Sequence, residues 1–566
     1  MFQSDITSRL ASLSSGLPPV IIVTAVLIAS SLFLWPTPLE FPMDDTYIHF
    51  VYAQNLAEQG RLMFNLASER GVGNTSLLWV LLLAGGHALG LPIPVLAKVL
   101  GMVSLATVGV GLYVLLRPLW RPLPALTGAL LVALSGNLLW FAFSGMETVL
   151  FLALGVLALL IYRENRWGWL GVALGLLTLT RPEGLALAVA IGCVELWRHR
   201  GIKRDIVVTG VICALICGSW LGYLLWRTGY ILPTGAIGKR LSFTVGARLV
   251  AEKNELLAVL GRFPALAYVG LWTSYLLEFA LGGMALPPPR VHIGAAVGNP
   301  NYTLSLWAIV GWMGVIIPLL FAACRRVGTL RRWSGWIQDR ERRPMIVFLT
   351  WIVLHNLSYM LFMPVPGTAS RYGALNHVAL WLALTVGLLS FVRRPRLLPW
   401  LVGGLIVIAT ANTVYWNGVY DANLDHMQNV RIAAAHFVRD NVSPDEQCAA
   451  FDVGAIRYHG QRPVIDLGGL IDPGVGQRFL EGECDRYLVE NGVTCLVLPG
   501  RTGTTDGGWF DFARIMGLTT SPLLEIRRVA AFEIDHDRWL QGYLPTANYQ
   551  PTVTIYRLLA RDLANE

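Results

Sequence analysis

Charged residues are scarce in this 566-residue chain: 14% of positions are charged and 54% are hydrophobic. Soluble globular domains carry about 25% charged residues, so the composition excludes an ordinary soluble protein. It indicates an integral membrane protein with several spans. The net charge of +8 does not indicate nucleic-acid binding, because the basic residues cluster in short links between apolar segments, as orientation signals do.

Several motifs with a defined chemistry are missing from the sequence. The seven cysteines form no C-x-x-C pair, which argues against a metal or redox site built on cysteine. No G-x-G-x-x-G fingerprint, P-loop or nucleophile elbow occurs, so nothing supports nucleotide binding. Internal repeats, low-complexity segments and coiled-coil heptads are also missing.

Apolar segments long enough to cross a bilayer, which takes roughly 20 helical residues, recur through the first three quarters of the chain. Eight segments reach about this length: 18–35, 93–116, 123–143, 206–226, 304–324, 345–363, 373–391 and 398–416. The first has no small-residue cleavage pattern and is interpreted as a retained span. The run 148–162 is shorter, and 168–197 is interrupted by "TRPEG" (180–184), which predicts a hairpin of two short spans.

Charge in the links predicts the topology. Five links are basic: 117–121, 163–166, 198–204, 325–343 and 393–396. The positive-inside rule places all five in the cytoplasm. Two ambiguous apolar runs, 75–91 and 264–286, would move basic links outside if they spanned, so we expect interfacial or re-entrant helices there. The prediction is eleven spans in a transmembrane domain of residues 1–416, with a cytoplasmic N-terminus.

The tail, 417–566, is predicted to lie outside the membrane. Three short β-rich runs alternate there with helix-like stretches; the runs are 448–453, 463–469 and 494–500, and the stretches include 429–441 and 484–492. This alternation predicts a small α/β domain with a partly parallel sheet. The expected fold is therefore an α-helical polytopic membrane protein with a C-terminal α/β domain on the outer face.

Two adjacent acids, Asp44 and Asp45, follow the first span in "PMDDTYIH" (42–49). Carboxylates at a membrane edge are costly unless they are hydrated, paired or used. One interpretation is a capping pair at the N-terminus of an interfacial helix. The other is a general base, which needs an ionised carboxylate within reach of a hydroxyl. Repulsion between two close carboxylates raises the pKa of one of them.

Glu147 lies in "SGMET" at the predicted outer end of a span. It is either a solvated loop acid or a second carboxylate facing the same cavity, where it would orient an acceptor or a metal. His49 could shuttle protons, although an ordinary polar position in a helix is the favoured interpretation.

Cations gather on the same predicted face. Arg371 and Tyr372 begin the span at 373, where the helix dipole disfavours a cation, so we expect an anionic partner for Arg371. Arg371 and Lys239 suit phosphate contact; the alternative for each is snorkelling to lipid headgroups. For Arg181, a structural pair with Glu183 is favoured over ligand contact.

Together these segments resemble the C-type (GT-C) superfamily of membrane glycosyltransferases, which use polyprenyl-phosphate sugars. The likeness is strongest to bacterial relatives of the mycobacterial terminal arabinofuranosyltransferases. It covers most of the chain in family order, through short segments at 44–65, 71–84, 144–151, 179–187, 232–239, 370–380 and 454–473.

The resemblance implies that Asp44 or Asp45 deprotonates an acceptor hydroxyl, which attacks the anomeric carbon with inversion. Glu147 would line the same cavity, and Lys239 and Arg371 would neutralise the lipid phosphate. It implies a polyprenyl-phosphate sugar donor, a glycan or lipid acceptor, and a location in a bacterial cytoplasmic membrane with the tail in the periplasm. Some superfamily members bind a divalent cation near the acidic motif and others do without, so metal use stays open.

The sugar is also left open, with a pentofuranose such as arabinofuranose as one candidate, because "LPTGAIGK" (232–239) lacks the Asn of related loops. Two other functions stay open. One is a transporter or flippase of lipid-linked sugars, which often shows paired repeats that this chain lacks. The other is a ligase that transfers a whole lipid-linked glycan.

Overall fold

The structure is a computed structural model in which the positions of most residues are described. The described residues are 2–35, 39–66, 71–235, 238, 290–292, 303–305, 317–318, 321–322, 325, 335–362, 367–391, 396, 398–500, 511–542 and 549–561. Lys239, the predicted interfacial segment 264–286 and most of the predicted span 304–324 lie outside these residues.

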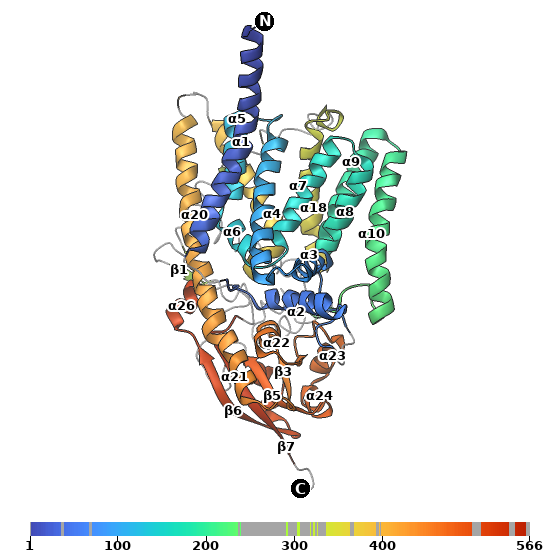
Figure 1. The fold of residues 1–566 in the computed structure, drawn as a ribbon, viewed down its shortest axis with the longest axis vertical. Helices are drawn as coiled ribbons and strands as arrows, with labels where there is room; N and C mark the ends of the chain where they lie inside the picture. The colour runs from blue at the N-terminus through green and yellow to red at the C-terminus, as the bar shows by residue number, and fades with distance from the viewer. Residues whose placement is uncertain are drawn as a thin grey trace.

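A helical bundle forms one half of the molecule and a sheet-containing unit the other (Figure 1). The bundle helices are α1 (Phe2–Leu34), α4 (Ile93–Leu116), α5 (Pro122–Ala133), α6 (Gly136–Phe143), α7 (Thr148–Arg163), α8 (Trp167–Thr180), α9 (Leu185–His199), α10 (Arg204–Thr228), α18 (Arg343–Phe362), α19 (Ala374–Phe391) and α20 (Leu398–His426). A short 3-10 turn, η1 (Pro182–Gly184), joins α8 to α9. The turn lies within the segment that predicts the hairpin.

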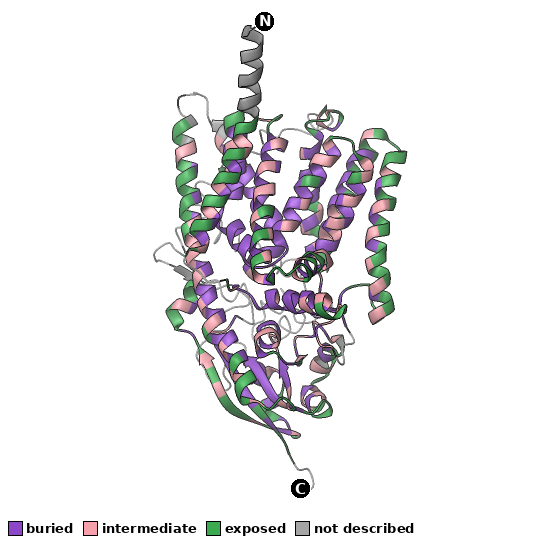
Figure 2. Ribbon diagram, in the orientation of Figure 1, coloured by how far each residue is buried: buried purple, intermediate pink, exposed green. Residues whose placement is uncertain are grey.

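Four of the described helices, α1, α4, α10 and α18, are long and apolar enough to cross a membrane, and a bent pair, α5 with α6, makes a possible fifth. Large apolar side chains on α10 and α20 are exposed, among them Leu215, Trp226 and Trp400. Figure 2 shows such exposed faces along the outer helices of the bundle. An apolar outer surface of this kind suits contact with lipid, whereas the count of eleven spans stays a prediction.

The apolar run 123–143, predicted as one span, is not a straight helix: α5 and α6 meet at a bend of 49°. A side chain from another helix contacts the chain at this bend. Asn412 of α20 accepts a hydrogen bond from the Gly136 backbone N–H at 2.8 Å, which satisfies a free donor at the start of α6. Ser135 donates its hydroxyl back to Val132 O at 2.8 Å.

Two helices near the bundle's lower end are short. α3 (Leu77–Ala88) has 12 residues, about 18 Å at 1.5 Å per residue, which is less than the roughly 30 Å hydrocarbon core. α2 (Asp44–Gln59) lies crosswise between the bundle and the sheet (Figure 1). Both helices therefore lie at the boundary of the two halves, as expected for interfacial segments.

The five-stranded sheet has the order β4-β3-β5-β7-β6. Its strands are β3 (Gln447–Ala450), β4 (Val464–Asp466), β5 (Val493–Pro499), β6 (Leu524–Glu533) and β7 (Thr552–Ala560). β3 pairs in parallel with β4 and β5, whereas β7 pairs antiparallel with β5 and β6. The predicted partly parallel sheet is confirmed.

Helices surround this sheet and connect it to the bundle. They are η6 (Met427–Ile432, a π-helical turn), α21 (Ala433–Asn441), α22 (Gly454–Gly460), α23 (Pro473–Glu481), α24 (Cys484–Glu490), α25 (Phe512–Ile515), η7 (Leu518–Thr520) and α26 (His536–Gln541). A separate pair of short strands, β1 (Arg290–His292) and β2 (Thr303–Ser305), is antiparallel. The remaining 3-10 turn, η4 (Thr368–Gly373), precedes α19.

One hydrophobic cluster spans the boundary. It contains Tyr47 of α2, Trp79 of α3, Met427 of η6 and Cys448 and Cys495 of the sheet. Because α2 buries one side against the bundle and the other against the sheet unit, the acidic motif at its start is held between the two.

Candidate active site

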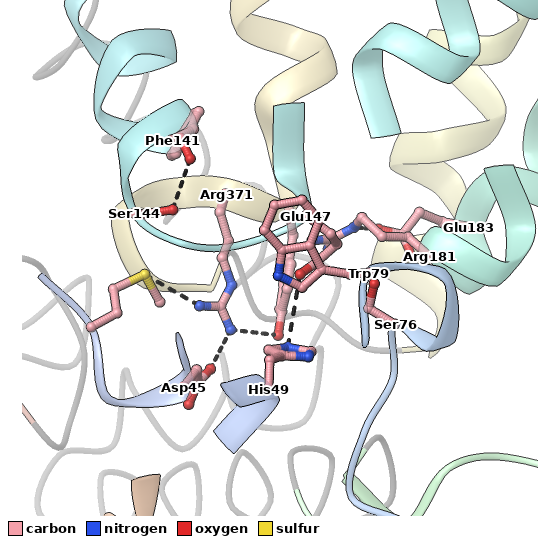
Figure 3. A network of polar contacts seen from close by, with 12 residues as sticks. Asp45, His49, Ser76, Trp79, Phe141, Ser144, Glu147, Arg181, Glu183 and Arg371 are labelled. Carbon is pink, nitrogen blue, oxygen red and sulfur yellow. Dashed lines mark hydrogen bonds and ion pairs between the residues drawn. The ribbon is translucent and has the colours of Figure 1, made fainter. Parts of the chain in front are cut away.

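Asp45 and Arg371 form an ion pair although 326 residues separate them. Asp45 lies in the first turn of α2, and Arg371 lies in η4, directly before α19. The Arg371 side chain is 3% exposed and that of Asp45 is 27% exposed. The anionic partner expected for Arg371 is thus Asp45 (Figure 3), and the carboxylate is the more accessible of the two groups.

Glu147 is the second acid of this site, and it is buried. Its Oε1 accepts from Arg181 Nη1 at 2.8 Å, and its Oε2 lies 3.8 Å from His49 Nε2. Arg181 also donates from Nε to Glu183 Oε1 at 2.5 Å and from Nη2 to the Tyr359 hydroxyl at 3.1 Å. The predicted Arg181–Glu183 pair is present, and the same guanidinium holds Glu147 in place.

Tyr372 lies between the two guanidinium groups. Its ring is 4.7 Å from the Arg181 guanidinium carbon and 5.2 Å from that of Arg371. Its hydroxyl is 3.5 Å from Arg371 Nη2. A cation over an aromatic face is stabilised by the ring quadrupole. Tyr372 therefore separates two like charges at short range.

The loop that carries Glu147 is held by hydrogen bonds to three consecutive carbonyls. Lys98 Nζ donates to Phe143 O at 2.9 Å, Thr46 Oγ1 to Ser144 O at 2.6 Å, and Trp79 Nε1 to Gly145 O at 3.0 Å. The donors come from α4, α2 and α3. Gly145 has φ +79°, and a Cβ there would lie 2.3 Å from Thr46. These contacts therefore fix the conformation of the "SGME" loop and the position of Glu147, which directly precedes α7.

Asp44 points away from this site and into the sheet unit. Its two carboxylate oxygens accept the backbone N–H groups of Gly454 and Ala455, each at 2.8 Å, at the start of α22. Arg431 of η6 lies 4.0 Å from Asp44 and 2.5 Å from Asp452. Burial of Asp44 and the nearby charge of Asp452 together raise the pKa of Asp44 to about 7, although both carboxylates share the Arg431 guanidinium.

Seven of the eight predicted site residues lie within the described chain, and six of them gather around α2 and η4. Asp45, His49, Glu147, Arg181, Arg371 and Tyr372 come together, whereas Asp44 does not join them and Lys239 lies outside the described residues. The sequence interpretation missed Arg431, Asp452, Lys98 and Tyr359. Lys98 was detectable as the single charge within the run 93–116.

Guanidinium groups hold both acids of the site. Each carboxylate already pairs with a guanidinium, Asp45 with Arg371 and Glu147 with Arg181. The described part of the chain contains no group of three or more His, Cys, Asp or Glu placed to hold a metal. Each guanidinium contacts one oxygen of its carboxylate, and Glu147 Oε2 has no hydrogen-bond partner among the described residues.

Comparison with known proteins gives one family match. A domain of unknown function, DUF8728, matches residues 420–556, which cover the end of α20 and the sheet unit. No curated protein matches the sequence.

Several solved structures are similar to the chain. The Archaeoglobus fulgidus oligosaccharyltransferase in the apo form is 14% identical over 84% of this chain and 69% of that one, with a TM-score of 0.49. ArnT from Cupriavidus metallidurans bound to undecaprenyl phosphate is 12% identical over 95% and 97%, with a TM-score of 0.45. Arabinofuranosyltransferase AftD from Mycobacteria is 16% identical over 96% of this chain and 40% of that one, with a TM-score of 0.41.

Proposed function

We propose that the chain is a GT-C glycosyltransferase of the bacterial cytoplasmic membrane, with the sheet unit in the periplasm. It moves a sugar from a polyprenyl-phosphate donor to a hydroxyl of a cell-envelope glycan or lipid, with inversion at the anomeric carbon. The sugar class, with a pentofuranose such as arabinofuranose as one candidate, belongs to the same proposal.

The observation that carries the proposal is the pairing of Asp45 with Arg371 beside Glu147 and Arg181. This cluster brings a carboxylate and two guanidinium groups together at the junction of an apolar bundle and a polar unit. A transfer from a lipid phosphate needs a base for the incoming hydroxyl and a cation for the departing phosphate. A lipid donor would enter from the bundle side and a polar acceptor from the sheet side.

Of the two adjacent acids, Asp45 is the base in this scheme. A general base must come within hydrogen-bond reach of the proton that it takes. Asp44 is buried and both its oxygens accept backbone N–H groups of the sheet unit, whereas Asp45 is partly exposed. Asp45 takes the acceptor's proton as the acceptor oxygen forms its bond to the anomeric carbon. The carbon–oxygen bond to phosphate breaks with its electron pair on the phosphate oxygen.

The remaining charged residues hold the leaving group and the site. Arg371 neutralises the phosphate, with Lys239 as a second cation in the proposal. A guanidinium suits this role because it offers several donors in a fixed plane to an oxyanion. Arg181 stays bound to Glu147 and Glu183 and fixes the wall of the site rather than the donor.

The test is an assay of polyprenyl-phosphate release by the purified full chain, given polyprenyl-phosphate sugars and envelope acceptors. Asp45→Asn should lower turnover at least about 100-fold, the usual contribution of a general base. Asp44→Asn should retain most of the turnover of the folded protein. Full turnover by Asp45→Asn would contradict the assignment of the base.

The same assay distinguishes the alternatives. A flippase would move the labelled donor across the bilayer of a proteoliposome without releasing polyprenyl phosphate. A ligase would release polyprenyl diphosphate or phosphate only from lipid-linked glycans of several sugars. Release of polyprenyl phosphate from a single-sugar donor supports the proposed transferase.

A further inference from the structure

The side chain of Asp45 pairs with Nη2 of Arg371. Elsewhere the Arg371 guanidinium faces protein groups, since Nη1 is 3.5 Å from Met43 Sδ and Nη2 is 3.5 Å from the Tyr372 hydroxyl. Arg371 is buried while Asp45 is partly exposed. Figure 3 shows the guanidinium descending from η4 to meet the carboxylate from α2. An anion that binds Nη2 of Arg371 would therefore take the position that Asp45 occupies.

The Nε of Arg371 is a further hydrogen-bond donor. This atom is buried and has no hydrogen-bond partner among the described residues. A buried donor without a partner is costly, and a bound oxyanion would satisfy it. An oxyanion with several oxygens can accept from Nε and a terminal nitrogen of one guanidinium together.

We propose that Asp45 and the lipid phosphate compete for Arg371, so that donor binding displaces Asp45 from the guanidinium. This inference rests on the proposed function and adds to it that donor binding activates the base. A carboxylate paired with a guanidinium binds protons weakly. Asp45 is therefore a poor base while it pairs with Arg371 and becomes a stronger base once phosphate has replaced it.

The exchange makes the order of events depend on the donor. Before the donor binds, the Asp45 carboxylate that faces the acceptor hydroxyl is paired with Arg371. After the donor binds, the same carboxylate is released beside the anomeric carbon. The acceptor is then activated only when a sugar is present to receive it, which disfavours hydrolysis or acceptor turnover without donor.

The exchange predicts that an inactivating substitution raises the affinity for polyprenyl phosphate. If Asp45 competes with phosphate, the inactive variant Asp45→Asn should bind polyprenyl phosphate more tightly than the wild type. We expect a roughly tenfold lower Kd, because a charged competitor is replaced by a neutral one. Arg371→Gln should weaken binding, and Asp45→Asn should give no gain when it is added to Arg371→Gln.

The experiment measures binding of undecaprenyl phosphate to the purified full chain in detergent, with melting temperatures to confirm folding. Asp425→Asn is the matched control, since Asp425 near the end of α20 pairs with Arg538 of α26 at 2.6 Å, and it should bind as the wild type does. An unchanged or higher Kd for Asp45→Asn would overturn the exchange.

Failure of the exchange and failure of the proposed function give different results. If the wild type binds undecaprenyl phosphate and turns over but Asp45→Asn shows no gain in affinity, only the exchange is wrong. If the wild type neither binds undecaprenyl phosphate nor releases it from any donor, the proposed function and the exchange are both wrong.

Discussion

Consecutive residues of an α-helix point about 100° apart, and Asp44 and Asp45 use this difference at the start of α2. Asp44 turns to the sheet unit, where its oxygens accept the N–H groups of Gly454 and Ala455. Asp45 turns to Arg371. The two carboxylates are adjacent in sequence but point in different directions. Asp44 joins the two halves of the molecule, and Asp45 faces the site.

Asp44 makes the stability of this junction depend on pH. Folding raises the pKa of Asp44 from 3.8 to about 7, so its contribution to stability is present below about pH 4 and is lost as the pH rises through about 7. We expect the melting temperature of the wild type to exceed that of Asp44→Asn most near pH 4. The difference should narrow toward pH 8 when tryptophan fluorescence is followed in detergent.

Asp421→Asn is the control for this measurement, because Asp421 of α20 is half exposed and pairs with Arg538 of α26. The difference between this variant and the wild type should not follow the same pH course. A difference between the wild type and Asp44→Asn that grows with pH would contradict the assignment.

Charged residues within or beside apolar segments predicted much of the candidate site. Asp45, Glu147, Arg181 and Arg371 interrupt apolar segments, where an ionised group is costly and therefore conspicuous. The same reasoning could not divide Asp44 from Asp45, since the division depends on contacts with a unit more than 400 residues away. Arg431 and Asp452 were missed because charges are ordinary in the polar tail.

At the scale of elements, small residues let the bundle helices approach closely. A Cβ at Gly101 of α4 would lie 1.8 Å from Ala142 O of α6, and one at Gly136 would lie 2.6 Å from Asn412 O of α20. Close approach of helix backbones is the usual role of glycine between membrane helices. The bent pair α5–α6 thus packs against α4 and α20 at positions where no side chain fits.

Gly101→Ala is expected to destabilise the protein, because the contact at α6 is with backbone and cannot be relieved by a side-chain rotation. Overpacking of this kind usually costs about 1–3 kcal/mol. The matched control is Gly210→Ala in α10, where a Cβ would meet nothing within 4 Å and alanine is the better helix former. Melting temperatures in detergent should fall for Gly101→Ala and not for Gly210→Ala; equal values would contradict the packing argument.

Local patterns predicted the secondary structure better where burial is simple. The three parallel-paired strands β3, β4 and β5 were expected as short apolar runs, and they lie in the buried part of the sheet. β6 was missed, because this edge strand mixes charged and apolar residues and has an irregularity between Arg528 and Ala530. Most of its positions are exposed or half-buried, so β6 lacks the regular apolar/polar alternation on which strand prediction depends.

At the scale of the whole molecule, the two halves are joined by continuous helix. α20 continues through residue 416, the predicted end of the transmembrane domain, to His426, and η6 and α21 extend it to Asn441. Trp140 of α6 donates to Asn423 Oδ1 at 3.1 Å, and Asn423 donates to the Tyr549 hydroxyl at 2.8 Å. These hydrogen bonds connect α6 of the bundle, through α20, to Tyr549 of the sheet unit.

The opposite end of the bundle carries the basic links. Arg340 donates to Arg163 O at 2.8 Å, and Arg343 donates to Asn165 Oδ1 at 2.8 Å, so the described parts of links 163–166 and 325–343 meet there. The sheet unit lies at the other end of the bundle (Figure 1). Basic links at one end and the acidic motif at the other are the arrangement that the positive-inside rule requires of the proposed orientation.

This orientation can be measured with single cysteines and a membrane-impermeant maleimide. Asp440 and Arg340 have exposed side chains at opposite ends of the molecule. In cells with a permeabilised outer barrier and an intact cytoplasmic membrane, Asp440→Cys should be labelled, because the sheet unit is proposed to face outward. Arg340→Cys should be labelled only after lysis, with the wild-type chain giving the background of its own cysteines. Labelling in the reverse order would place the site on the cytoplasmic side, where a periplasmic lipid-phosphate donor could not reach Arg371.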